Sequence, residues 1–67
     1  MTINNMLREL GYTTSASGIT EFQRDYNRVG TQPVLLTGKF DSRTTAALEL
    51  AYSAIEMFTA TRDLRKG

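Results

Sequence analysis

The serines are the first side chains that could perform catalysis, and the chain offers nothing to activate them. They are Ser15, Ser17, Ser42 and Ser53. A serine becomes a nucleophile when a neighbouring base takes its proton and nearby donors stabilise the oxyanion. The sequence contains no histidine, which is the commonest general base, and no Gly-x-Ser-x-Gly motif. We therefore expect no serine chemistry.

The carboxylates could in principle form the acid–base pair that hydrolyses glycosidic bonds. They are Glu9, Glu21, Asp25, Asp41, Glu49, Glu56 and Asp63. Most fall on polar faces of predicted helices, and Asp25 is expected on such a face, paired with Arg28 three residues further on. Without cysteine or histidine, the usual thiolate and imidazole metal ligands are missing. We expect a protein that is not an enzyme and binds no metal or cofactor.

Three segments have the apolar spacing of amphipathic helices, and these helices must hold any binding site in place. They cover residues 3–10, residues 18–29 and residues 42–62, and no glycine or proline interrupts the last of them. A connector, residues 31–39, contains the only proline and a Thr-Gly turn signal. The pattern predicts an all-α fold, a small three-helix bundle with a long C-terminal helix.

Short polar residues indicate where each helix begins. Thr2, Ser17 and either Asp41 or Ser42 are the expected N-caps, because their side-chain oxygens can accept hydrogen bonds from first-turn amides. Gly11 follows the first helix, where a left-handed residue commonly ends a helix.

Length and charge limit the possible partners. The chain has 67 residues, enough for one domain, whose core we expect in residues 3–51, with a helical extension and a frayed tail in residues 52–67. Its net charge of +1 argues against a nucleic-acid partner. No apolar run approaches the ~20 residues that cross a membrane. The N-terminus has neither the basic nor the apolar region of a signal peptide.

One apolar centre should hold the helices together. We expect it to contain Met6, Leu7, Leu10, Phe22, Phe40 and Leu48. The amide of Gln23, next to Phe22, should satisfy backbone groups of the irregular connector. Gly38 allows a positive φ before the chain turns inward at Phe40.

The motifs follow one another in a specific order. A Gly-Tyr pair ends the first helix, a Phe-Gln pair lies in the second, and a Thr-Gly-x-Phe-Asp-x-x-Thr segment leads into the third. The positions are Leu7, Leu10, Gly11, Tyr12, Ile19, Phe22, Gln23, Leu36-Thr37-Gly38-Lys39-Phe40-Asp41-Ser42-Arg43-Thr44, Ala47 and Leu48. This order resembles the peptidoglycan-binding domain family across residues 3–50. It is also similar to the helical part of matrix metalloproteinase propeptides, whose zinc-blocking cysteine is missing here.

The resemblance implies a non-catalytic module that binds peptidoglycan or muropeptides and holds a larger protein or assembly at the cell envelope or outside the cell. The expected ligand-binding residues are Tyr12, Arg24, Arg43 and Thr44. Arg43 could grip a stem-peptide carboxylate with its guanidinium fork, and Tyr12 offers an aromatic face to a sugar ring. The loop at residues 13–18 is shorter than in fuller members of the family, where it helps form the wall of the glycan groove.

A second apolar stripe on the third helix favours an alternative function. A first helix of about 12 Å cannot cover both sides of one about 30 Å long, so some apolar residues should stay exposed. They are Leu50, Tyr52, Met57 and Phe58. Exposed apolar surface often marks an interface, which predicts a protein-interaction or assembly module with a protein partner or a homo-oligomer through the C-terminal helix. In a simpler interpretation, the N-terminus and residues 34–36 fold over this stripe.

Overall fold

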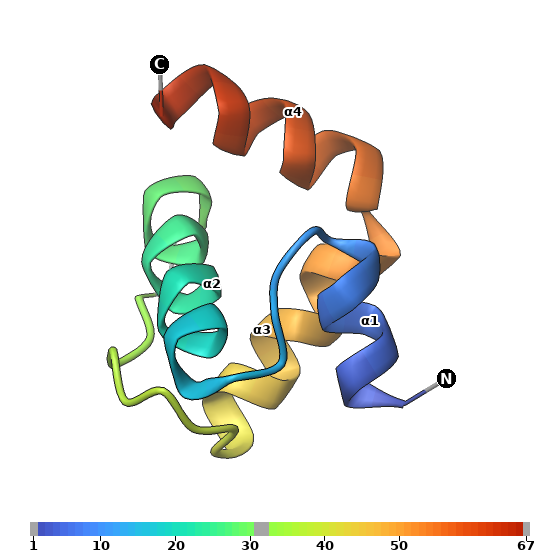
Figure 1. Cartoon of the computed structure of the whole chain (residues 1–67). Coiled ribbons are helices and arrows are strands. Elements are labelled where there is room, and N and C mark those ends of the chain that lie inside the picture. The colour runs from blue at the N-terminus through green and yellow to red at the C-terminus, as the bar shows by residue number, and fades with distance from the viewer. Residues whose placement is uncertain (1, 31–32, 67) are drawn as a thin grey trace.

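The computed structural model describes residues 2–30 and 33–66, and these residues form four α-helices and no strand (Figure 1). The helices are α1 (Ile3–Glu9), α2 (Ala16–Val29), α3 (Ser42–Ser53) and α4 (Ile55–Lys66). Helix α1 lies against α3, α4 lies across the end of α2, and α2 and α3 also touch (Figure 1). The predicted all-α class is confirmed, but the count of three helices is wrong.

Two of the predicted helix starts are confirmed. Thr2 caps α1 by accepting a 3.2 Å hydrogen bond from the Asn5 amide. Asp41 caps α3 by accepting one of 2.8 Å from the Thr44 amide. Gly11 follows α1 with φ +96°, the left-handed conformation that its position predicts.

The predicted start of the second helix is wrong. Ser15, not Ser17, is the N-cap of α2, and its hydroxyl accepts a hydrogen bond from the Gly18 amide. Gly18 therefore lies inside the first turn of α2 and does not begin the helix. Its lack of a side chain leaves room for the preceding loop. A Cβ atom there would lie 2.1 Å from the Thr13 carbonyl oxygen, so glycine lets the loop pass close to the helix.

The long third helix of the prediction is broken at Ala54, whose φ of −122° and ψ of 46° are not helical. The Ser53 hydroxyl donates a 2.8 Å bond to the Leu50 carbonyl at this point, a side-chain contact that often accompanies a bend. The break turns α4 back over α2 and places Phe58 5.9 Å from Phe22, ring centroid to ring centroid. Burial of Phe58 thus overrides the helical preference of the sequence.

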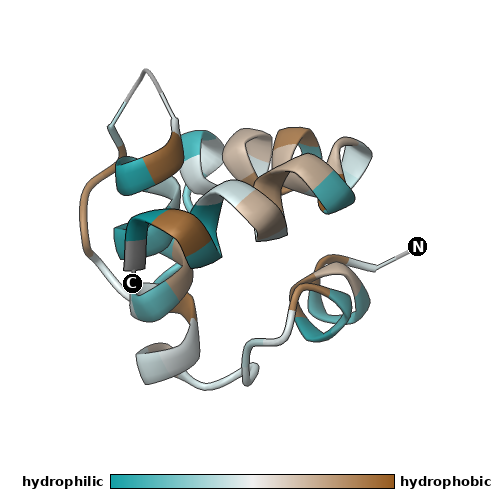
Figure 2. Ribbon diagram, turned by 90° about the horizontal axis from the view of Figure 1, so that it is seen from above, coloured by the Kyte–Doolittle hydropathy of each residue, from teal (hydrophilic) through white to brown (hydrophobic). Residues whose placement is uncertain are grey.

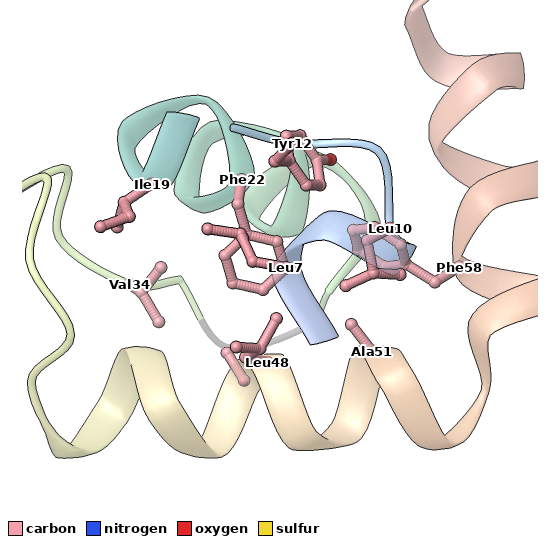
Figure 3. Packing of buried hydrophobic residues seen from close by; sticks show 10 residues of the cluster. Leu7, Leu10, Tyr12, Ile19, Phe22, Val34, Leu48, Ala51 and Phe58 are labelled. Atoms are coloured by element: carbon pink, nitrogen blue, oxygen red, sulfur yellow. The ribbon is translucent and has the colours of Figure 1, made fainter. Parts of the chain in front are cut away.

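The predicted apolar centre is present. Leu7, Leu10, Phe22 and Leu48 are almost completely buried, and Met6 and Phe40 pack against them while partly exposed. The rest of the cluster, much of it visible in Figure 3, consists of Tyr12, Ile19, Val34, Ala47, Ala51 and Phe58. Apolar and polar residues interleave along the helical ribbons in Figure 2, as amphipathic helices require.

Candidate functional site

Tyr12 belongs to the core, so the expectation of an open aromatic side chain in the loop is wrong. Its side chain is only 6% exposed, and its ring meets Phe22 edge to face at 5.7 Å. Its hydroxyl donates a 2.7 Å hydrogen bond to Asp25. Burial, and then the bond to Asp25, raise the pKa of Tyr12 well above its ordinary value. The aromatic face is therefore closed to a sugar ring.

Thr44 is also buried, and its hydrogen bonds are structural. Its hydroxyl oxygen accepts a 2.9 Å bond from the Gln23 amide, and its backbone amide donates to Asp41. The Thr44 amide holds the pKa of the Asp41 carboxyl below its ordinary value, because it stabilises the ionised form. Thr44 thus fixes the start of α3, and its burial contradicts the expectation of an accessible side chain.

The side chain of Gln23 holds the connector, as predicted. Its Oε1 accepts the Gly38 amide at 3.0 Å, and its Nε2 donates to the hydroxyl of Thr37 at 3.1 Å and to the carbonyl of Lys39 at 3.3 Å. Gly38 has φ +70°, the positive value that the turn requires. One buried amide therefore fixes the segment that precedes α3.

Asn27 holds the other half of the connector, a role that no motif in the sequence indicated. Its Oδ1 accepts the Val34 amide at 2.7 Å, and its Nδ2 donates to the Val34 carbonyl at 2.9 Å. These two hydrogen bonds resemble the pair that links residues on neighbouring β-strands. Because of it, the connector is held against α2 at both Val34 and Gly38.

A hollow of about 560 Å³ lies between α2, this anchored connector and α3. It is lined by Tyr26, Pro33, Val34, Arg43, Ala46, Ala47 and Leu50. Arg43 is the only charged side chain among these lining residues, Tyr26 is half-buried, and Leu50 is exposed at 62%. The volume falls in the range of ligand pockets, and the lining suits a ligand with a carboxylate and an apolar part.

A second hollow of about 490 Å³ runs along the outer side of α2. Its lining includes Arg24, Arg28 and Glu21, so both signs of charge are present. The two hollows share no lining residue. Arg43 and Arg24 therefore line different hollows, and Tyr12 and Thr44 line neither of these two.

A buried polar network joins the loop after α1 to α2 and α4. The predicted pair of Asp25 and Arg28 is present at 3.3 Å, but Asp25 is buried instead of lying on the outer face. Arg62 donates 2.8 Å to the Leu10 carbonyl and 3.3 Å to the Tyr12 hydroxyl, and its guanidinium lies 5.5 Å from the centre of the Tyr12 ring. Arg62 is therefore fixed, where a frayed tail was expected.

The predicted interface residues divide into exposed and buried groups. Met57 is 72% exposed and Leu50 62%, whereas Tyr52 is half-buried. Phe58 is only 4% exposed, so it is part of the core and the expectation that it stays exposed is wrong. The break at Ala54 explains the difference, because it turns Phe58 inward and leaves Met57 on the outside.

Among the described residues, no three acidic, cysteine or histidine side chains are grouped closely enough to hold a metal ion. None of the helices described here combines the length and apolar character that a membrane crossing needs.

Comparisons of the chain with protein-family models, with curated proteins and with solved structures found no match.

Proposed function

We propose that this chain is a non-catalytic peptidoglycan-binding module whose binding site is the hollow between α2, the connector and α3. The observation that carries the proposal is the position of Arg43 on the wall of that hollow. Arg43 belongs to the Thr-Gly-x-Phe-Asp-x-x-Thr segment on which the family resemblance rests. The peptide stems of peptidoglycan end in carboxylates, which a guanidinium can bind through two parallel hydrogen bonds.

The surroundings of Arg43 support this assignment. The half-buried Tyr26 and the aliphatic side chains of Val34, Ala46 and Leu50 can contact the alanine methyl groups of a stem peptide. The wall is formed before any ligand arrives, because Asn27 and Gln23 fix the connector. A preformed wall lowers the ordering cost of binding. An open site of this kind binds weakly alone, and linkage to other modules would raise the avidity.

Sedimentation with purified murein sacculi tests the proposal. We expect the wild-type protein to sediment with the sacculi and Arg43→Ala to lose most of this retention. Arg24→Ala is the matched control, because it removes the same charge from the second hollow and should be retained like the wild type. Arg43→Lys should recover binding only in part, since a lysine lacks the planar fork. Absence of wild-type retention, or equal loss in both alanine variants, would refute the proposed site.

A second candidate is a protein-interaction module, and the exposed apolar side chains favour it. Leu50, Met57 and Leu64 are between 62% and 82% exposed. Met57 and Leu64 lie seven residues apart on α4, so they share its outward side. Failure to bind sacculi, together with association by light scattering that Met57→Gln and Leu64→Gln abolish, would favour this candidate over wall binding.

A further inference from the structure

The residue that separates α3 from α4 carries no sequence signal for a helix break. Ala54 is an alanine, the strongest helix former, and residues 42–66 contain neither glycine nor proline. Ala54 also keeps both of its helical hydrogen bonds. Its amide donates to the Leu50 carbonyl at 3.3 Å, and its carbonyl accepts the Phe58 amide at 2.8 Å. The local sequence therefore favours one continuous helix over the bent pair.

Straightening the chain at Ala54 would add helical hydrogen bonds. The first amides of any helix lack partners within it, so those of Ile55, Glu56 and Met57 gain nothing from α4 itself. In a continuous helix they would donate to the carbonyls four residues earlier, at the end of α3. The bend therefore has to be maintained by contacts that α4 makes elsewhere.

Those contacts all lie beyond the bend, on the inner side of α4. Phe58 packs on Phe22, Arg62 donates to the Leu10 carbonyl, and Arg65 donates a 2.8 Å bond to the Arg28 carbonyl. None of them involves Ala54. A straightened α4 would lose all of them and expose Phe58 to water, which is unfavourable for an isolated chain.

We infer that two copies of this chain can exchange α4, each with α3 and α4 joined in one continuous helix. The α4 of one copy then occupies the place on α2 that the other copy's α4 has vacated, so that every inner contact of α4 is remade between chains. The occupant is a second copy because the vacated surface, with its Phe22 ring and Leu10 carbonyl, is shaped by the α4 sequence itself. Exchange of an identical element at a short hinge is a common route to dimers. The inference uses the inner side of α4 and does not depend on either proposed function.

Two substitutions beside the hinge should move the equilibrium in opposite directions. In the bent monomer, Glu56→Pro places a proline in the first turn of α4, where proline is tolerated. In the straightened chain, the same proline lies in the interior of a continuous helix, where it is not tolerated. A cost of about 3 kcal/mol per straightened helix predicts dimerisation at least about 100-fold weaker. Ser53→Ala removes the hydroxyl bonded to the Leu50 carbonyl and should increase the dimer fraction. Glu56→Gln is the matched control, because it removes the same charge and leaves the helix intact.

The measurements are light scattering over a concentration series and NMR on a mixture of isotope-labelled and unlabelled chains. We expect a concentration-dependent dimer in the wild type and in Glu56→Gln, and a monomer with unchanged circular dichroism in Glu56→Pro. Isotope-filtered spectra of the wild-type dimer should show contacts between Phe22 of one chain and Phe58 of the other. A wild type that stays monomeric up to NMR concentrations, a dimer whose Phe22–Phe58 contacts are all within one chain, or a Glu56→Pro variant that dimerises normally would each overturn the inference. The NMR result does not depend on the folding of any variant.

Discussion

The hydroxyl of Tyr12 donates a 2.7 Å hydrogen bond to Oδ2 of Asp25, a residue 13 positions further along the chain. Asp25 also accepts from Arg28, and the Tyr12 oxygen accepts from Arg62. The bond thus joins the loop after α1 to α2, and Arg62 adds α4 to the same network. The stability of the fold should respond to each member of this network.

Removal of the Tyr12 hydroxyl should destabilise the protein. Tyr12→Phe keeps the ring on Phe22 but takes one donor from the buried Asp25 carboxylate, which costs about 1–3 kcal/mol in the free energy of unfolding. Urea unfolding followed by circular dichroism measures this difference. Tyr52→Phe, at a half-buried position on α3, is the control for loss of a hydroxyl. Equal stability of Tyr12→Phe and wild type would show that the bond contributes nothing net.

The same hydroxyl should make the fold sensitive to alkali. The pKa of Tyr12 is raised in the folded state by burial and by Asp25. The stabilisation that its protonated hydroxyl gives the fold is therefore fully present below the unfolded pKa of about 10. Above that pH the unfolded chain loses the proton and the folded chain does not, and stability falls. Urea midpoints measured from pH 8 to pH 11 should decline in the wild type and decline less in Tyr12→Phe. Parallel curves for the two proteins would contradict the assignment.

Two neighbouring residues of α4 should respond very differently to truncation. Phe58→Ala leaves a cavity against Phe22 and Tyr26 and should cost about 3–5 kcal/mol, whereas Met57→Ala at the exposed position should change stability by less than about 0.5 kcal/mol. Thermal or urea unfolding gives both values. A small effect of Phe58→Ala would mean that α4 is not integral to the domain.

The side-chain amide of Gln23 should contribute strongly to the stability of the fold through its hydrogen bonds. Gln23→Met fills the same space but leaves the Gly38 amide and the Lys39 carbonyl without this partner, at a cost of about 2–4 kcal/mol. Amide hydrogen exchange at Gly38 should also become faster, because its acceptor is gone. Unchanged protection of that amide would show that the connector is held in another way.

Local chemistry made several features predictable from the sequence. The N-caps at Thr2 and Asp41 and the positive φ at Gly11 and Gly38 depend only on residues within one turn. The role of Gln23 was predictable too, because a polar amide beside the core residue Phe22 needs partners wherever it is buried.

The features that could not be predicted from the sequence depend on contacts between distant segments. Nothing in the sequence near Ala54 indicates a break, since the bend follows from the packing of Phe58 on Phe22, a residue far from both in the sequence. Tyr12 lies in a loop by its sequence, and its contacts with Asp25 and Phe22 place it inside. The hollow beside Arg43 also depends on a distant contact, because Asn27 holds the connector that forms one of its walls.

The bond from Arg62 to the Leu10 carbonyl spans 52 residues, much further than the contacts that fix the caps and the connector. Closing so long a loop costs more chain entropy than forming a cap, and such contacts tend to form late during folding. We expect α1, α2 and α3 to assemble first and α4 to arrive last. In a nascent or refolding chain, α4 would then be the last segment to dock on the rest of the domain.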